Sequence, residues 1–254
     1  MSEKKPLRFP ADWVRRKSEG QKISMLTAYD ASMARLLARS SVDALLIGDS
    51  LSMVIQGNTS TLPVTLDEMI YHCRMVRRGA PDLFLLGDLP FGSYNISVEQ
   101  GVESGIRMMK EGHVSAVKLE GATDEHLEIV RRLHAAGVPV MGHIGLMPQS
   151  YLNTGGFRVQ GRDADAAVRL KEEAQKLQEA GSFALLMELV ARDLTREISQ
   201  ALTIPTIGIG SGVDADGQVL VINDMLGMDP GFHPRHLKIY AEVGKLIEEA
   251  ANSY

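Results

Sequence analysis

The sequence predicts one (β/α)8 TIM barrel over residues 1–254, and three observations support this fold class. A length of 254 residues suits a single parallel barrel better than two small domains. Short apolar runs alternate with amphipathic helical stretches, a rhythm that favours parallel strands joined by right-handed crossovers. Eight such runs occur along the chain, and eight strand–helix units close a barrel. An open, doubly wound sheet is the alternative fold that the same rhythm allows.

Each candidate strand is a run of four to six mostly apolar residues that ends in a turn. The runs are Ile23–Ala28, Ala44–Ile47, Leu83–Leu86, Ser115–Leu119, Val138–His143, Phe183–Glu188, Thr206–Ile209 and Gln218–Ile222. Helices are expected between them, and several have polar residues suited to cap their N-termini. These are Thr65 with Glu68 and Ser97 with Gln100, both as capping boxes, and Asp163. Gly137 and Gly181 follow helices where a left-handed residue is favoured.

Two segments depart from this rhythm. Residues 1–20 precede the first strand, and we expect them to form an N-terminal helical extension that plugs or flanks the barrel. The connection Gly145–Arg162 is long, contains four glycines and one proline, and lacks periodicity. Long connections inside compact domains are usually functional lids or disordered segments. We therefore expect this loop to close over a site.

Composition restricts the partners and the compartment. The formal net charge of −5 argues against nucleic acid and anionic membranes as partners. No apolar run approaches the ~20 residues of a membrane span, and Met1–Trp13 lacks the apolar core of a secretory signal. The single cysteine, Cys73, permits no intrachain disulfide, which fits a cytoplasmic protein. Because Cys73 lies on the apolar stripe of a predicted helix, we expect a packed core thiol rather than a nucleophile.

Titratable residues end five successive candidate strands, the second to the sixth. In barrels of this kind the active site forms where the strands end at their carboxyl termini. One charged residue there could simply be solvated, but five in register predict a site. The residues are Asp49, Asp88, Lys118 with Glu120, His143 and Glu188.

Asp49, Asp88 and Glu120 are oxygen donors from three neighbouring strands. Mg²⁺ binds few carboxylates and keeps positions for water and substrate, so these residues predict a magnesium site. The alternative is that Asp49 and Asp88 only cap the helices that follow. Zinc is not expected, because Cys73 lies on a helix and only His143 offers a nitrogen nearby.

Lys118 and Glu120 lie two residues apart on a strand and therefore point to the same side. With Val117 and Leu119 facing the helices, both should face the barrel interior. A buried charge needs a partner, and the ammonium is well placed to hold a substrate carboxylate or oxyanion. The alternative is a plain interior salt bridge.

Glu188 shares the inward face of its strand with Ala184 and Leu186. Apolar surroundings should raise its pKa, which makes Glu188 a candidate general base. An internal ion pair with Lys118 is the alternative. For His143, a catalytic role and a supporting role are equally compatible with the sequence. The run Gly208–Gly212 resembles a phosphate-binding loop, but it fits no nucleotide fingerprint and is interpreted as a tight turn.

The motifs at these strand ends resemble those of the ketopantoate hydroxymethyltransferase family. The resemblance runs in unbroken order from about Met25 to Gly227. The matching stretches are Met25–Asp30, Gly48–Leu51, Gly87–Tyr94, Val117–Gly121, Gly142–Gly145, Pro148–Gln149, Gly155–Phe157, Gln160–Arg162, Ile207–Gly212 and Asp216–Val221.

This resemblance implies a barrel of the phosphoenolpyruvate/pyruvate type and a Mg²⁺-dependent reaction. The family moves a hydroxymethyl group from 5,10-methylenetetrahydrofolate to 3-methyl-2-oxobutanoate, which gives 2-dehydropantoate for pantothenate and coenzyme A synthesis. It also suggests a homo-oligomer, a decamer of two pentameric rings. Carried over residue by residue, the metal ligands are Asp49, Asp88 and Glu120, and the substrate contacts are Asp49, Ser50, Asp88 and Lys118. Glu188 is the implied proton acceptor.

The sequence departs from the family pattern at a few positions, none of which removes a catalytic group. Asn223 stands where many relatives have histidine, Ser211 where alanine is frequent, and Leu189-Val190 where Cys-Val is common. A carbon–carbon lyase of the same superfamily, acting on an oxo acid, is the nearest alternative function. Such lyases carry a catalytic cysteine in a Lys-Lys-Cys-Gly motif, which this chain lacks. A non-catalytic metabolite-binding barrel is a further alternative, which the five charged groups disfavour.

Overall fold

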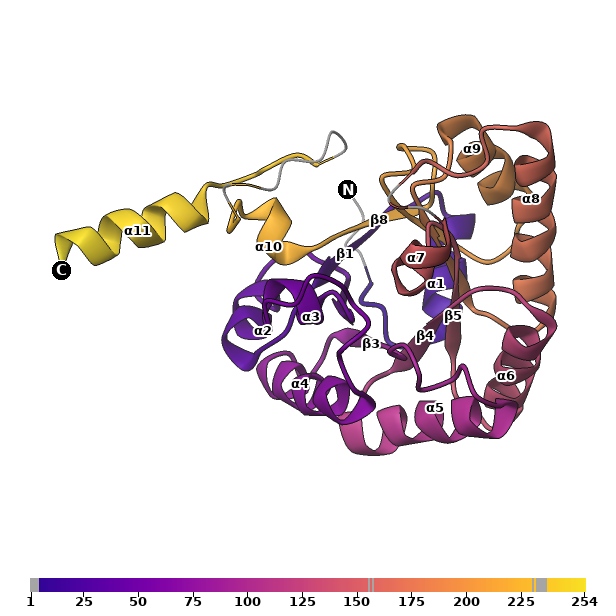
Figure 1. The fold of residues 1–254 in the computed structure, drawn as a ribbon, viewed down its shortest axis with the longest axis horizontal. Coiled ribbons are helices and arrows are strands. Elements are labelled where there is room, and N and C mark those ends of the chain that lie inside the picture. The colour runs from indigo at the N-terminus through magenta and orange to yellow at the C-terminus, as the bar shows by residue number, and fades with distance from the viewer. Residues whose placement is uncertain (1–4, 155, 157, 230, 232–236) are drawn as a thin grey trace.

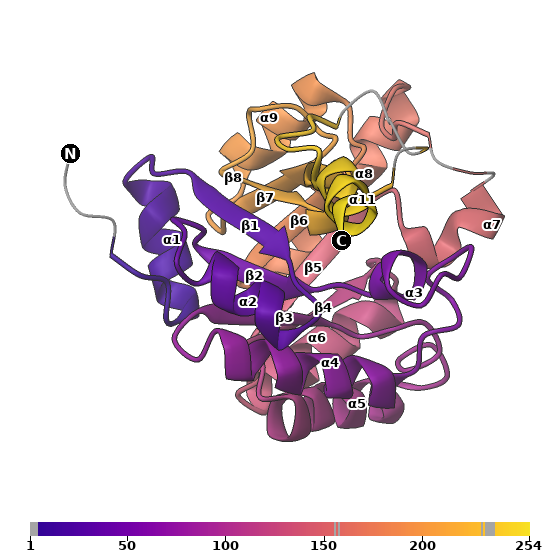
Figure 2. The ribbon, with the colours of Figure 1, turned by 90° about the vertical axis from the view of Figure 1, so that its left-hand side faces the viewer.

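The computed structural model describes residues 5–154, 156, 158–229, 231 and 237–254, and its core is a closed barrel of parallel strands. The strands follow one another around the barrel in sequence order, and the eighth pairs with the first (Figures 1 and 2). Their bounds are β1 Ile23–Thr27, β2 Ala44–Ile47, β3 Phe84–Asp88, β4 Ala116–Glu120, β5 Val140–Gly145, β6 Ala184–Glu188, β7 Thr206–Ile209 and β8 Gly217–Leu220. The predicted barrel is confirmed, and the open-sheet alternative is wrong.

Strands β3, β4 and β5 begin and end one or two residues later than the sequence pattern predicts. For β3 and β4 the pattern ends the strand at its last apolar residue, whereas the ladder continues into Asp88 and Glu120. Asp88 pairs with Lys118 across β3 and β4, and Glu120 pairs with His143 across β4 and β5. The charged residues are therefore part of the sheet, which fixes their direction more firmly than a loop would.

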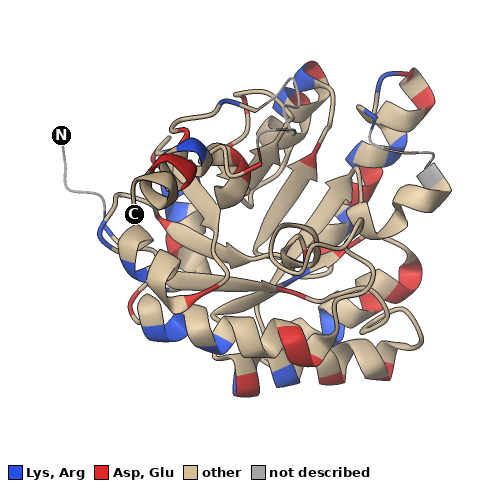
Figure 3. Cartoon of the chain, turned by 60° about the vertical axis from the view of Figure 1, so that its left-hand side comes forward, with Lys and Arg blue, Asp and Glu red and all other residues tan. Residues whose placement is uncertain are grey.

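Helices cover the outside of the barrel between the strands (Figure 1). The longer ones are α2 Ala31–Leu37, α4 Leu66–Gly79, α5 Val98–Gly112, α6 Asp124–Ala135, α8 Ala164–Glu179 and α9 Arg192–Ala201. The short ones are α3 Leu51–Val54, α7 Tyr151–Thr154, α10 Ile222–Met225 and the 3₁₀ turn η1 Pro148–Ser150. Along the longer helices, residues of both charges are interspersed on the outer faces (Figure 3).

The predicted helix ends are largely confirmed. Thr65 and Glu68 form the expected capping box on α4. Ser97 and Asp163 each accept a hydrogen bond from the N–H three residues later. The second box is only half formed, because the Gln100 side chain accepts from the N–H of Ile96 rather than from that of Ser97. Gly137 and Gly181 have φ of 81° and 105°, as the helix-end prediction requires.

Helix α1, Pro10–Ser18, lies at the end of the barrel where the strands begin (Figure 2). Its Trp13 is fully buried and packs edge-on against Phe84 and Phe183, with ring centroids 5.2 and 5.5 Å away. Leu7, just before the helix, joins the same apolar cluster. The segment therefore plugs the barrel floor, one of the two placements predicted for it, and leaves the opposite mouth for a site.

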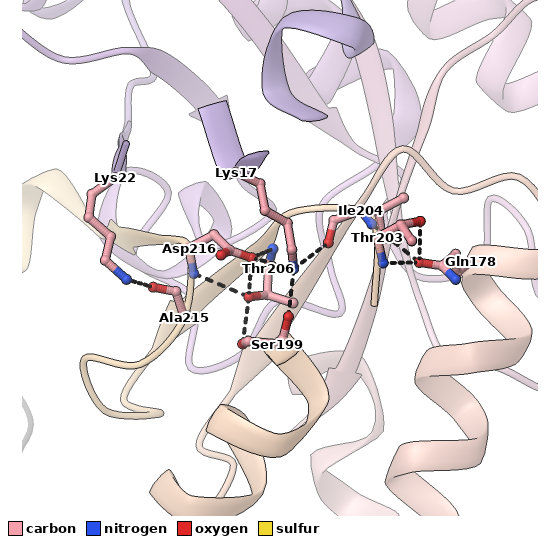
Figure 4. Close-up of polar contacts among 9 residues, drawn as sticks. All are labelled: Lys17, Lys22, Gln178, Ser199, Thr203, Ile204, Thr206, Ala215 and Asp216. Carbon is pink, nitrogen blue, oxygen red and sulfur yellow. Dashed lines mark hydrogen bonds and ion pairs between the residues drawn. The ribbon is translucent and has the colours of Figure 1, made fainter. Parts of the chain in front are cut away.

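Lys17 connects helix α1 to the last strands of the barrel (Figure 4). Its ammonium donates to the carbonyl oxygens of Ser199 at 2.6 Å and Ile204 at 3.0 Å, and lies 2.9 Å from Asp216 Oδ2. The same carboxylate oxygen accepts a hydrogen bond from the N–H of Thr206. One lysine thus joins α1 to α9, β7 and the turn before β8.

Helix α11, Val243–Ser253, projects away from the barrel (Figure 1) and buries none of its residues. Its Leu246 and Ile247 are more than half exposed. The outward-pointing residues at the centre of β1 and β8, Ser24 and Gln218, are exposed as well. The barrel face beside these strands therefore lacks the helix cover that the other strands have. Among the described residues, no helix has the length and apolarity needed to cross a membrane.

Candidate active site at the carboxyl ends of the strands

The five strands bring the predicted site residues together at the mouth opposite the α1 plug. Asp49 follows β2 in the turn before α3, Asp88 and Glu120 end β3 and β4, and Glu188 ends β6. Asp49, Asp88, Lys118, Glu120 and His143 are all at most 4% exposed, whereas the Glu188 side chain keeps 19% exposure. The site is therefore a buried group of charges with one partly open carboxyl.

Lys118 lies at the centre of this group. As predicted, Lys118 and Glu120 point into the barrel, while Val117 and Leu119 pack in the cluster beneath the helices. Lys118 Nζ lies 3.2 Å from Asp88 Oδ1 and 3.8 Å from Glu120 Oε1. Burial alone would lower the pKa of the Lys118 ammonium, but the carboxylates of Asp88, Glu120 and Asp49 outweigh it and raise that pKa. These carboxylates therefore favour the charged ammonium form of Lys118.

The two aspartates do not cap helices, which excludes the alternative role that the sequence allowed. Helix α3 begins after Ser50 without a side-chain cap, and α5 is capped by Ser97. The N–H of Asp49 instead donates to Asp88 Oδ2 at 3.1 Å. This contact fixes one carboxylate against the backbone of the other residue.

Negative charge exceeds positive charge at this mouth, because three buried carboxylates accompany one ammonium. Burial, together with repulsion by Asp88 and Glu120, holds the pKa of Asp49 well above its usual range. Burial also raises the pKa of Asp88, although the Lys118 ammonium 3.2 Å from its Oδ1 opposes this shift. A divalent cation would relieve this imbalance, so the residues fit the implied metal.

These carboxylates do not form a closed metal cage by themselves. Within the described part of the chain, no three His, Cys, Asp or Glu side chains are gathered as a metal-binding group. Mg²⁺ is commonly bound by one or two carboxylates and completes its shell with water and substrate oxygens. An open, incomplete site is therefore compatible with Mg²⁺, and the ligand set of Asp49, Asp88 and Glu120 stays a prediction.

Glu188 has the environment that the sequence predicted. Ala184 and Leu186 share the barrel interior with it, while Leu185 and Met187 face the helices. Burial, reinforced by the negative charge of Glu120, raises the pKa of Glu188 to about 8. The described contacts include no ion pair between Glu188 and Lys118, and the nearest cationic candidate is His143, whose Nε2 lies 3.5 Å from Glu188 Oε2. A carboxyl with this pKa can exchange protons near neutrality.

His143 lies between the lysine and this glutamate. Its Nδ1 is 3.3 Å from Lys118 Nζ and 3.5 Å from Glu120 Oε1. Burial and the positive charge of Lys118 lower the pKa of His143, so its ring is neutral. Because an ammonium can only donate, the shorter contact favours Nδ1 as the acceptor and places the ring proton on Nε2. Nε2 lies 3.5 Å from Glu188 Oε2, without a hydrogen bond between the two atoms.

Two residues that carried no predicted role complete the mouth. Tyr94, in the loop after β3, donates from its hydroxyl to the amide oxygen of Gln149 at 2.6 Å. Gln149, in η1, donates to Asp49 and Glu120. Both residues lie within motifs of the family resemblance, but no rule of spacing or strand position points to them. Ser50, a predicted substrate contact, shares a hydrogen bond with the Tyr29 hydroxyl at 2.9 Å.

The run Gly208–Gly212 forms the predicted tight turn, with φ of 63° at Gly210 and 83° at Gly212. Within it, Ser211 donates to the carbonyl of Met187 at 2.8 Å and accepts from the N–H of Val190 at 3.0 Å. These bonds bracket Leu189, whose φ of 47° is unusual for a residue other than glycine. Ser211, one of the departures from the family pattern, thus holds the backbone in place directly after Glu188.

The connection Gly145–Arg162 is more regular than its sequence suggested. It contains η1 and the one-turn helix α7, whereas residues 155 and 157 lie outside the described part. Gly145 has φ of 96°, and a side chain there would collide with the Glu188 carbonyl. The loop therefore begins in close contact with the site, while its closure stays a prediction.

Cys73 is a core thiol, as predicted. It is fully buried on α4, and its Sγ lies 3.6 Å from Met108 Sδ. Burial raises the pKa of this thiol. A buried thiol with a raised pKa, placed under the helices rather than at the mouth, cannot supply the nucleophile or acid of a lyase.

The chain is similar to known proteins of one family. The family model described as ketopantoate hydroxymethyltransferase matches residues 10–254. A 3-methyl-2-oxobutanoate hydroxymethyltransferase of Leptospira interrogans is 50% identical over 234 residues, covering 92% of this chain and 88% of the relative. An enzyme of the same name from Anaeromyxobacter sp. (strain Fw109-5) is 50% identical over 244 residues, covering 94% of this chain and 80% of the relative.

Solved structures with similar folds are much more distant in sequence. A 2,3-dimethylmalate lyase of the PEP mutase/isocitrate lyase superfamily aligns with a TM-score of 0.64 at 15% identity, covering 97% of this chain and 86% of the other. A phosphonopyruvate hydrolase aligns with a TM-score of 0.65 at 10% identity, covering 97% of this chain and 85% of the other. These likenesses concern the fold, and they confirm the predicted type of barrel.

Proposed function

The chain belongs to the ketopantoate hydroxymethyltransferase family, and we propose that it uses 5,10-methylenetetrahydrofolate as donor and Mg²⁺ as cofactor. The acceptor is 3-methyl-2-oxobutanoate, and the products are 2-dehydropantoate and tetrahydrofolate, with one water consumed. The observation that carries this proposal is the partly open Glu188, whose pKa of about 8 suits a base, beside a buried group of three carboxylates and one ammonium. Such a site suits removal of a weakly acidic hydrogen next to a carbonyl.

The metal would be held by Asp49 and Asp88, with Glu120 as the third ligand that the family resemblance implies. When bound, Mg²⁺ would polarise the keto oxygen of the oxo acid and stabilise the negative charge that develops there. The support from this chain is the excess of carboxylates at the mouth and the raised pKa of the buried Asp49 and Asp88.

The protein residues would then divide the remaining work. Lys118, a charged ammonium within the mouth, would hold the carboxylate of the oxo acid, with Asp49, Ser50 and Asp88 as further contacts. Glu188 would take the hydrogen from the third carbon, and that carbon would form its new bond to the one-carbon unit of the folate. His143 would steady the Glu188 carboxylate from its Nε2 side.

The proposal is tested by supplying the purified protein with the oxo acid, Mg²⁺ and 5,10-methylenetetrahydrofolate. We expect 2-dehydropantoate and tetrahydrofolate to appear in equal amounts, measured by proton magnetic resonance. Omitting the folate should stop product formation. Fragmentation of the oxo acid without folate would instead indicate a lyase, and an unchanged substrate mixture would contradict the assignment.

We also propose a cytoplasmic homo-oligomer, with the decamer as the form that the family resemblance implies. Support for association comes from α11, whose exposed Leu246 and Ile247 lack cover, and from the uncovered barrel face at β1 and β8. Exposed apolar patches of this kind mark interaction surfaces. The double change Leu246→Glu and Ile247→Glu should lower the mass seen by analytical ultracentrifugation. An unchanged mass would exclude α11 from the interface.

A further inference from the structure

Gln149 connects the loop after β5 to the ends of three other strands. Its side-chain Nε2 donates to Asp49 Oδ2 at 2.8 Å and to the carbonyl oxygen of Leu89 at 3.0 Å. Its backbone N–H donates to Glu120 Oε2 at 3.1 Å. The residue is only 6% exposed. The side chain thus contacts the residues that follow β2 and β3, and the backbone N–H contacts the end of β4, although Gln149 belongs to none of these strands.

The orientation of this amide is determined by its neighbours. The carbonyl of Leu89 can only accept, so the atom facing it must be the amide nitrogen. On the other side, the Tyr94 hydroxyl donates to Gln149 Oε1 at 2.6 Å and accepts from the N–H of Glu120 at 3.3 Å. With both ends of the amide fixed, the remaining N–H is directed at Asp49.

These bonds use one oxygen of each of two carboxylates. Gln149 holds Oδ2 of Asp49 and Oε2 of Glu120, while Glu120 Oε1 faces Lys118 and His143. A free carboxylate can rotate and present either oxygen, whereas a carboxylate held in this way presents the other one in a fixed direction. Partners that orient ligating side chains typically matter nearly as much as the ligands themselves.

We propose that Gln149 is a positioning residue, whose side chain orients Asp49 so that its other carboxylate oxygen is presented to the divalent cation and the oxo acid. This inference rests on the proposed function of the same mouth. The bonds of Gln149 also hold the first part of the Gly145–Arg162 loop against three strand ends.

The test compares Gln149→Met with the wild-type protein. Methionine keeps a similar size but can neither donate to Asp49 nor accept from Tyr94. We expect affinity for Mn²⁺, used as a spectroscopic substitute for Mg²⁺ and measured by electron paramagnetic resonance without substrate, to fall by about 10- to 100-fold. The KM for 3-methyl-2-oxobutanoate should rise as well. Gln160→Met makes the same change in the same loop, where the side-chain amide donates to the carbonyl of Arg158, and should leave Mn²⁺ affinity unchanged.

Measuring thermal unfolding of each variant distinguishes a positioning role of Gln149 from a merely structural one. A variant that is only less stable should still bind Mn²⁺ with unchanged affinity while it is folded. Tyr94→Phe serves as a second variant should Gln149→Met fail to fold, since it removes only the hydroxyl that anchors the amide. We expect it to weaken Mn²⁺ binding less than Gln149→Met, but by more than twofold. Folded variants that bind Mn²⁺ within twofold of the wild type would overturn the inference. A wild-type protein that binds no Mn²⁺ would overturn the metal proposal itself, and this inference with it.

Discussion

Replacing Glu188 with glutamine should slow proton exchange at the third carbon of 3-methyl-2-oxobutanoate by about 10²- to 10⁴-fold, the usual contribution of a positioned base. Glutamine keeps the shape of the side chain and removes its basicity. The effect should be large because Glu188 is the one carboxyl at this mouth with appreciable exposure, at 19% for its side chain. Its buried neighbours are committed to Lys118, Gln149 and one another.

The exchange can be followed without folate, in heavy water containing Mg²⁺ and the oxo acid. Proton magnetic resonance should show the methyl doublet collapse toward a singlet as the single hydrogen is replaced. His143→Asn should cost less than Glu188→Gln, because the ring is neutral and only contacts Glu188, at 3.5 Å, rather than taking the proton itself. Undiminished exchange by Glu188→Gln would move the base elsewhere, with His143 the next candidate.

The pH dependence of this exchange has a definite sign. Only the ionised Glu188 carboxylate can accept the proton, so the rate should fall as the pH drops through the pKa of that group. For the protein without a cation this pKa lies at about 8. A divalent cation bound beside it favours the charged form and moves the pKa down. Raising the Mg²⁺ concentration should therefore extend activity to lower pH.

The sequence predicted the strand-end residues because two simple regularities locate them. Apolar runs mark the strands, and the carboxyl ends of barrel strands converge on one mouth, so Asp49, Asp88, Lys118 and Glu188 could be placed from their positions alone. The alternation of side chains along a strand then gave the inward direction of Lys118 and Glu188. These features depend on local order, which a sequence carries directly.

The contacts of Gln149 and Tyr94 could not be predicted in this way. Gln149 bonds to Asp49, 100 positions earlier in the chain, through a loop whose path depends on the glycine turn at Gly145 and on η1. The position of helix α11 could not be predicted for the same reason. An apolar stripe indicates that a helix packs against another surface, but it does not indicate which surface. The projection of α11 away from the barrel was therefore not predicted.

Removing the divalent cation should abolish hydroxymethyl transfer, and added Mg²⁺ should restore it. Lewis-acid stabilisation is worth several kcal/mol, so a chelated protein should lose at least ~10³-fold in rate, since each 1.4 kcal/mol is a factor of ten. The charge at the mouth supports a requirement of this size. Burial and neighbouring carboxylates raise the pKa of Asp49, burial raises that of Asp88, and a bound cation would favour the charged forms of both.

Asp88→Asn distinguishes a direct ligand from a carboxylate that only contributes charge. We expect weaker Mn²⁺ binding and a comparably large loss of turnover, with cooperative unfolding retained. Two opposing effects on stability should leave the metal-free protein folded. The change relieves repulsion among buried carboxylates, but it removes the carboxylate 3.2 Å from Lys118. Lys118 still has Glu120 as a partner. Asp193→Asn is the matched control, because that carboxylate is 84% exposed on α9 and should affect neither measurement. Full turnover in excess chelator, or unchanged Mn²⁺ affinity in Asp88→Asn, would show that this mouth does not depend on a metal held by Asp88.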